Sequence, residues 1–313
     1  MIDEALALEH LAKSFQTRTG RIDAVRDVSV HVKRGTVLAF LGPNGAGKTT
    51  TIKMAAGLVW PDAGEVTVSG RTLHRHHDWA TARIGAVLEG SRNLYWRLTV
   101  MENLLYWGTM RRMPRQDAAR RATELLERVG LADRARNTVQ TLSRGMQQKV
   151  ALCQALMHRP EVLLLDEPTL GLDYESGEGI KHVVRELTQD GTAILLTTHQ
   201  LDVAQELANE VSIIRDGRVV LSGPTASLLA QHSRPIVSVR AAAPWPSDLS
   251  SRLAGLPVSV TAVDTLDITL TESGDPIVYR VLERLEPHPL LAVERHQADL
   301  VEVFQDTLEV KTS

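Results

Sequence analysis

A glycine-rich loop ending in a lysine and two threonines lies near the start of the chain. The apolar run Val37–Leu41 precedes it, and its residues are Gly42, Pro43, Asn44, Gly45, Ala46, Gly47, Lys48, Thr49 and Thr50. The spacing G-x-x-x-x-G-K-T between a buried strand and a helix start is typical of a phosphate-binding loop. Successive N–H groups and the positive helix end face one anion, while Lys48 reaches the terminal phosphates. With the Thr49 hydroxyl as a ligand for Mg²⁺, this loop indicates that the chain binds a nucleoside triphosphate.

Two acids end a second apolar run, at 162–165, and a histidine follows a third, at 193–197. Buried charges are costly without a metal or a partner, so acids at a strand end beside a phosphate loop indicate Mg²⁺ and water. We expect Asp166 to hold the water shell of the metal and Glu167 to act as general base on the attacking water. At the same edge of a parallel sheet, His199 is placed to contact the γ-phosphate.

A second candidate phosphate site opens the helix that follows Leu142. Ser143 is suited to cap this helix, and Gly145 permits close approach of a ligand. Taken alone, the segment is an ordinary helix start, but its hydroxyl and exposed N–H groups can also hold phosphate. One nucleotide cannot easily reach both phosphate sites within one chain. The two sites together therefore predict a head-to-tail dimer.

Apolar runs alternate with segments of helical period, which predicts an α/β domain with a parallel sheet. The expected elements are strand 37–41, helix 48–58, strand 162–165, helix 175–188, strand 193–197 and helix 201–209. Alternating apolar and polar residues at 5–11, 25–32 and 65–69 predict half-solvated antiparallel strands. Helical patterns over 99–129, with a break at Pro114, and over 143–157 predict a helical subdomain inserted at about 90–160.

The composition changes near 232–235, which divides the chain into a first domain over 1–232 and a small accessory domain over 234–313. In the second domain we expect strands at 236–240, 258–262, 267–270 and 291–295 and helices at 247–253, 276–285 and 298–307. This alternation predicts a small α+β domain. Its role is open, with dimerisation and regulation as alternatives.

Composition and charge limit the cellular location that we expect for the chain and the kinds of partner that it binds. Charged residues make up 23% of the chain and the formal net charge is −3, without a long basic block, so no nucleic-acid partner is expected. The single cysteine excludes an internal disulfide, and the first residues lack the pattern of a signal peptide. No apolar run approaches the roughly 20 residues that span a bilayer. We therefore expect a cytosolic chain whose membrane role, if any, is peripheral.

Taken together, the motifs resemble those of the nucleotide-binding subunit of ABC transporters over about residues 5–232. GPNGAGKTT is similar to the phosphate loop of that family, LSRGMQQ to its signature motif and VLLLDE to its second nucleotide-binding motif. LGLD, ending at Asp173, resembles the D-loop, and His199 resembles the switch histidine. The resemblance implies a P-loop ATPase core, with a mixed sheet, an antiparallel β subdomain and an inserted helical subdomain, that uses ATP and Mg²⁺.

The resemblance also implies roles for residues that spacing alone does not single out. Phe15 matches the aromatic residue that stacks on adenine, with a place in the apolar core as the alternative. Glu89 stands where the family has the Q-loop glutamine, and its carboxylate keeps an oxygen for Mg²⁺. Asp173 is implied to lie at the dimer seam, where Ser143 and Gly145 of the second chain complete each ATP site.

The signature carries Arg144 and Met146 in place of the commoner glycine and glutamine. With the segment 93–103 and the short C-terminal domain, this variant resembles bacterial exporters of the daunorubicin-resistance type. The resemblance implies an ATPase at the cytoplasmic face of the cell membrane that powers a separate permease for drug-like or other hydrophobic or amphiphilic cargo. The second ATPase of the dimer is implied to be another copy of the chain or a paralogue.

Several alternatives stay open. The surface that receives the permease includes Tyr95, Trp96 and Trp107, unless these aromatic residues belong to the core of the helical subdomain. The ATPase of an importer and a soluble ABC-type ATPase acting as an assembly factor are rival functions. A nucleotide sensor without turnover is a third, against which the set of Asp166, Glu167 and His199 argues. The cargo is not identified, because the ATPase of this family never touches it.

Overall fold

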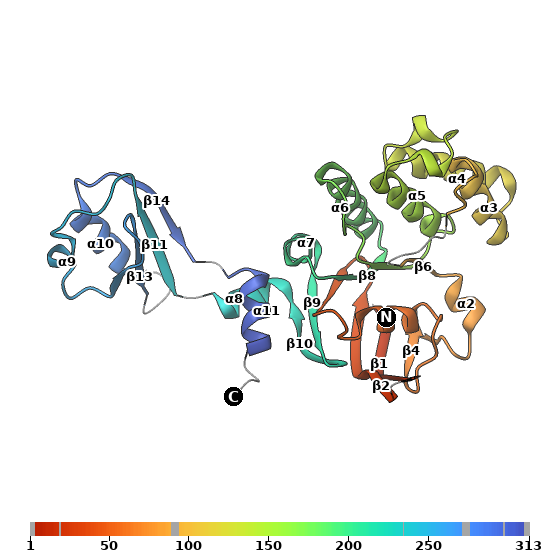
Figure 1. The fold of residues 1–313 in the computed structure, drawn as a ribbon, viewed down its shortest axis with the longest axis horizontal. Helices are drawn as coiled ribbons and strands as arrows, with labels where there is room; N and C mark the ends of the chain where they lie inside the picture. The colour runs from red at the N-terminus through yellow and green to blue at the C-terminus, as the bar shows by residue number, and fades with distance from the viewer. Residues whose placement is uncertain are drawn as a thin grey trace. The chain divides into compact units, whose positions relative to one another are not determined.

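A computed structural model describes residues 4–18, 20–88, 94–233, 235–270, 276–296 and 298–309 of the chain. They form two compact units, one reaching to Thr225 and including the chain from Thr307, the other comprising Ala226–Asp306. Figure 1 follows the chain through both units. The domain boundary predicted at 232–234 stays a prediction. Among the described residues, every helix is too short or too polar to span a bilayer.

The first unit is built on a ten-stranded sheet in the order β5-β4-β1-β2-β10-β9-β3-β8-β7-β6. Its strands are β1 (Glu4–Thr17), β2 (Gly20–Lys33), β3 (Val37–Leu41), β4 (Ala63–Val68), β5 (Arg71–Thr72), β6 (Ile84–Val87), β7 (Val162–Asp166), β8 (Ala193–Thr198), β9 (Glu210–Arg215) and β10 (Arg218–Pro224). Neighbours from β9 to β6 pair in parallel, whereas β2, β1, β4 and β5 pair antiparallel. The sheet is therefore mixed, which confirms the predicted fold class.

The central strands are buried on both faces. Every residue of β3 and β7 is buried. Because successive side chains of a strand point to opposite faces, Leu163 and Leu165 join one apolar cluster, and Val162 and Leu164 join another. Apolar runs of this kind are what parallel strands covered on both faces require. This is why the second nucleotide motif begins as an uninterrupted apolar run.

Helices cover the sheet and form the inserted subdomain. They are α1 (Lys48–Ala55), α2 (His77–Thr81), α3 (Val100–Met110), α4 (Arg115–Arg128), α5 (Arg144–Leu156), α6 (Tyr174–Gln189) and α7 (Leu201–Leu207). Figure 1 shows α3, α4 and α5 gathered together on one side of β6 and β8. A capping box between Thr99 and Glu102 starts α3, and Pro114 immediately precedes α4. The broken helical pattern of the sequence thus becomes two separate helices.

The second unit contains a four-stranded sheet in the order β12-β13-β11-β14, with every pair antiparallel. Its elements, with two helices whose ends belong to the first unit (α8 and α11), are α8 (Thr225–His232), β11 (Ile236–Ala241), α9 (Leu249–Arg252), β12 (Val258–Val260), β13 (Thr265–Thr269), α10 (Ile277–Leu285), β14 (Leu290–Arg295) and α11 (Leu300–Glu309). Val239, Ile268 and Val281 belong to one buried cluster, so α10 packs on one face of the sheet. This is the small α+β arrangement predicted from the sequence.

Candidate functional site

The phosphate loop connects β3 to α1 and is tightly enclosed by its neighbours. Gly47 has a φ of +111°, a conformation that side-chain-bearing residues rarely adopt. A Cβ atom on Gly47 would lie 2.5 Å from the carbonyl oxygen of Ala24, and one on Gly42 would lie 2.3 Å from that of Ile214. Lys48 is 7% exposed, and its Nζ donates to the carbonyl oxygens of Gly42 at 2.7 Å and Pro43 at 3.2 Å. The ammonium therefore lies over the loop that would hold the phosphates.

Asp166 and Glu167 lie beside this loop, as the sequence predicts. A cavity of 370 Å³ is lined by Ala24, Asn44, Gly45, Gly47, Lys48, Thr49, Thr50, Asp166 and Glu167. Asp166 Oδ1 accepts hydrogen bonds from Thr49 Oγ1, at 3.4 Å, and from Thr197 Oγ1. Its other oxygen, Oδ2, is buried and has no hydrogen-bond partner within the described part of the chain. An unpaired buried carboxylate oxygen is costly by itself and suits a hard cation, so the Asp166–Thr49 pair fits Mg²⁺.

Glu167 and His199 also lie together. Glu167 Oε1 is 2.8 Å from His199 Nδ1. The Glu167 side chain is 7% exposed and that of His199 is 48% exposed, so the histidine ring reaches solvent while the carboxylate stays enclosed. Glu167 has a φ of +51°. This left-handed conformation is uncommon for a residue with a side chain, and strained backbone of this kind is found at active sites where the surrounding structure fixes it.

Ser143, Gly145 and Asp173 form a separate group. Ser143 caps α5 by accepting a hydrogen bond from the Met146 N–H at 3.3 Å, and Asp173 caps α6 by accepting one from the Ser176 N–H at 2.9 Å. A Cβ atom on Gly145 would lie 2.1 Å from Ser176 Oγ, so the starts of α5 and α6 are in close contact. None of these residues lines the phosphate-loop cavity as the structure describes it.

Four other predicted positions have mixed outcomes. Phe15 is 39% exposed on β1, opposite Ile22 of β2, and its contact with adenine stays a prediction. Glu89 lies outside the described residues. Tyr95 and Trp96 are 46% and 51% exposed, which leaves these rings available to a partner.

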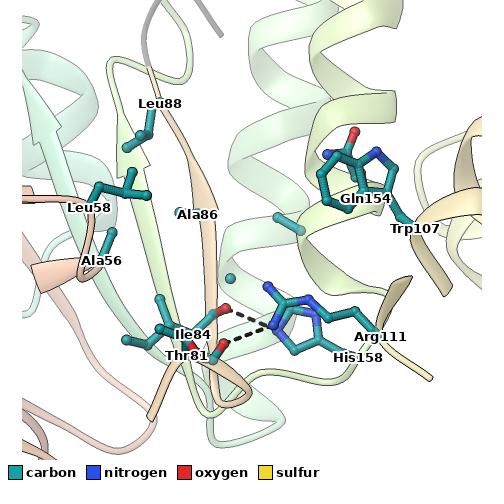
Figure 2. Close-up of a pocket in the computed structure, with 12 residues that line it drawn as sticks. Ala56, Leu58, Thr81, Ile84, Ala86, Leu88, Trp107, Arg111, Gln154 and His158 are labelled. Carbon is teal, nitrogen blue, oxygen red and sulfur yellow. Dashed lines mark hydrogen bonds between the residues drawn. The ribbon is translucent and has the colours of Figure 1, made fainter. Parts of the chain in front are cut away.

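A second cavity, of 280 Å³, lies apart from the phosphate loop, between the sheet and the helical subdomain (Figure 2). Its lining includes Leu58, Ile84, Leu88, Trp107, Arg111 and His158. Arg111 Nη1 donates to the Thr81 carbonyl oxygen at 3.0 Å, and His158 Nε2 is 3.0 Å from that of Ile84. Burial, helped by the charge of Arg111, lowers the pKa of His158 to about 4. His158 is therefore neutral near neutral pH.

Sequence reasoning missed three contributors to the candidate nucleotide site. Thr197 and Thr198 end β8 and contact the two acids at the end of β7. Ala24 of β2 contributes to the cavity wall. The threonine pair directly before His199 was a usable signal, because adjacent parallel strands bring their carboxyl ends together. Ala24 gave no such signal in the sequence, because it reaches the cavity only through contacts between segments that are distant in the chain.

Comparisons with known proteins agree with this geometry. The family described as "ABC transporter" matches residues 25–170. The linearmycin resistance ATP-binding protein LnrL of Bacillus subtilis (strain 168) is 37% identical over 226 residues, which is 72% of this chain and 71% of that protein. The daunorubicin resistance ATP-binding protein DrrA3 of Streptomyces coeruleorubidus is 38% identical over 267 residues, or 85% of this chain and 82% of that protein. A solved dimeric, post-hydrolysis state of the ATP-binding cassette MJ0796, bound to ADP and Pi, has a TM-score of 0.64 at 27% identity and covers 70% of this chain and 98% of that one.

Proposed function

The chain belongs to the ABC transporters as an ATP-binding subunit that hydrolyses ATP, and from that premise we propose that it powers export through a separate membrane permease. The cargo we propose is drug-like or otherwise hydrophobic or amphiphilic. Support comes from relatives named for linearmycin resistance, for daunorubicin resistance and for Nod factor export. A methionine import protein of Cutibacterium acnes is also similar, at 33% identity, so import is the alternative within the same family.

The nucleotide site supports specific roles for its residues. In our proposal, Lys48 and the N–H groups of the loop bind the β- and γ-phosphates of ATP. Asp166 and the Thr49 hydroxyl would hold Mg²⁺, which when bound neutralises charge on those phosphates. Glu167 takes the proton from the attacking water, and His199 faces the γ-phosphate through its solvent-exposed ring. The observation that carries this assignment is the single cavity lined by Lys48, Thr49, Asp166 and Glu167.

The second half of each ATP site is proposed to come from another cassette, either a second copy or a paralogue. Ser143 and Gly145 lie away from the phosphate-loop cavity, and Asp173 lies with them at the start of α6. Tyr174, next to Asp173, is 84% exposed, which suits a residue at a seam between chains. ATP then stabilises only the closed dimer of cassettes, and hydrolysis removes that stabilisation.

The permease is proposed to dock at the helical subdomain, on the cytoplasmic face of the membrane. The cavity of Figure 2 has an apolar floor that includes Leu58, Ile84 and Leu88, with the Arg111 side chain beside it. Exposed aromatic residues are frequent anchors of protein interfaces, and Tyr95 and Trp96 belong to this same subdomain. These features suit a protein partner at this surface, and the relatives named for resistance and export favour a membrane permease over a soluble assembly factor.

The Glu167→Gln substitution tests the catalytic part of the proposal. A chain that binds ATP without hydrolysing it should accumulate as a closed dimer, because the step that removes the stabilising nucleotide is blocked. We expect the variant to elute as a dimer with Mg·ATP and as a monomer with ADP in size-exclusion chromatography with light scattering. Wild-type turnover in the variant would rule out Glu167 as the base.

A further inference from the structure

The carboxylate of Glu167 is held from the neighbouring strand by the residue before His199. Thr198, the last residue of β8, is 0% exposed, and its Oγ1 donates to Glu167 Oε2 at 3.1 Å. The same oxygen accepts the backbone N–H of His199 at 3.4 Å, while Glu167 Oε1 lies 2.8 Å from the ring nitrogen Nδ1 of His199. Both carboxylate oxygens of Glu167 are thus fixed by the end of β8.

The hydrogen bond that the Thr198 hydroxyl donates has one possible acceptor here. The Gln200 N–H donates to Thr198 Oγ1 at 3.0 Å, so the hydroxyl accepts there and its own single proton goes to Glu167. Gln200 is held in turn, since its Oε1 accepts a hydrogen bond from Thr169 Oγ1 at 2.6 Å. Thr169 follows Glu167 along the chain by two residues, and the contacts therefore form a closed circuit between the loops after β7 and β8.

The backbone of Glu167 needs such support. Its φ of +51° lies in the region that favours glycine, and its N–H donates to the Thr197 carbonyl oxygen at 3.0 Å. Strand pairing sets Asp166 opposite Thr197, which brings Thr198 level with Glu167. Each of the two acids therefore faces one hydroxyl of the threonine pair.

We propose that Thr198 is a positioning residue for ATP hydrolysis, whose hydroxyl orients the Glu167 carboxylate toward the attacking water. This inference rests on the proposed role of Glu167 as general base. A carboxylate with both oxygens fixed has lost the freedom to rotate away from the water. Positioning of this kind lowers the entropic part of the barrier without adding any contact to the nucleotide.

The test uses the full chain with three threonine variants. Thr198→Val keeps the branched shape and removes the hydroxyl, whereas Thr198→Ser keeps the hydroxyl. Thr192→Val is the matched control, because Thr192 is also buried and lies just before the opposite end of β8. The quantities to measure are kcat and KM for ATP, the Kd of a fluorescent ATP analogue, and the melting temperature.

We expect Thr198→Val to lower kcat by about 10- to 100-fold, the effect of losing one hydrogen bond to a charged group. KM for ATP and the Kd of the analogue should stay within about twofold, because Thr198 does not line the phosphate-loop cavity. Thr198→Ser should recover most of the turnover, and Thr192→Val should match the wild type. In a Glu167→Gln background, adding Thr198→Val should leave the residual rate unchanged within about twofold, because the group that it positions no longer acts.

Either of two results would overturn this inference while leaving the proposed role of Glu167 in place. Either Thr198→Val retains wild-type kcat while Glu167→Gln is inactive, or Thr198→Ser is as defective as Thr198→Val. The serine variant also decides the question if the valine variant folds poorly, because it tests the hydroxyl directly. Wild-type turnover in Glu167→Gln would instead refute the proposed base, and the inference with it.

Discussion

Replacing Gly145 by alanine is expected to force apart the starts of α5 and α6. The added Cβ atom would lie 2.1 Å from Ser176 Oγ and 2.4 Å from Ser176 Cβ, far inside van der Waals contact. Overpacking of this kind costs about 1–3 kcal/mol, and the upper part of this range applies because the Ser176 Cβ atom cannot rotate away. The higher helix propensity of alanine offsets about 1 kcal/mol, which leaves a net loss of about 1–2 kcal/mol. For a domain of this size each kcal/mol lowers the melting temperature by about 2–4 °C, which predicts a fall of roughly 2–8 °C. Because Ser143 caps α5, displacing the start of this helix should also weaken the ATP-dependent dimer.

Ser176→Gly separates these two effects, because it removes both atoms that clash. The substitution has its own cost of about 0.5 kcal/mol, because glycine is a poorer helix former than serine, and it removes the hydroxyl that bonds Asp173 at 2.9 Å. With the clash removed, the double variant with Gly145→Ala should therefore melt at or slightly above Ser176→Gly alone, because alanine is the better helix former. Thermal melts and ATP-dependent dimer formation in the Glu167→Gln background measure both effects.

A wild-type melting temperature for Gly145→Ala would refute the close-contact reasoning. If the double variant regains its stability and its dimer, Gly145 acts through packing on α6. If it regains stability but stays monomeric with ATP, the missing side chain of Gly145 matters for the approach of the partner's nucleotide as well.

Three further predictions concern pH, nucleotide and metal. Between about pH 6.5 and pH 4 the unfolded chain binds a proton at His158 and the folded chain does not, so the free energy of unfolding falls by about 3 kcal/mol as the pH falls through this window. Denaturant titrations of His158→Gln should lack this pH dependence. An equal change of unfolding free energy with pH in wild type and variant would contradict the prediction. Phe15→Ala should raise the Kd for ATP by roughly 5- to 100-fold with little change in melting temperature, because the ring is exposed, and an unchanged Kd would remove the stacking role. Asp166→Asn should weaken binding of Mg·ATP but not of ATP in EDTA, as measured by calorimetry, and equal losses in both conditions would argue against a metal role.

The nucleotide site could be predicted because its main parts are local in the sequence. The phosphate loop and the acids at 166 and 167 each follow an apolar run, and β3 and β7 are indeed buried along their whole length. Parallel strands end at one edge of the sheet, so the sequence places these groups together without knowledge of the strand order. His199 followed from the same rule.

What could not be predicted depends on contacts between distant segments. The strand expected at 5–11 continues to Thr17, because β1 and β2 pair along most of their length. The helix expected at 48–58 ends at Ala55, and Gly57 after it has a φ of +72°. The close contact of Gly145 with Ser176 joins two helix starts that no sequence pattern connects. The fold class and the candidate site could be predicted from the sequence, whereas the strand order, the ends of the elements and the packing partners could not.

The central claim is that an ATP-driven pair of cassettes acts on a separate permease. Its most direct test is affinity purification of the Glu167→Gln chain from native membranes in mild detergent, once with Mg·ATP and once with ADP, followed by mass spectrometry. We expect a multi-spanning membrane protein to co-purify with the chain, with a second cassette present in the ATP sample. Recovery of soluble assembly or ribosomal proteins, with no membrane protein in either sample, would contradict the claim.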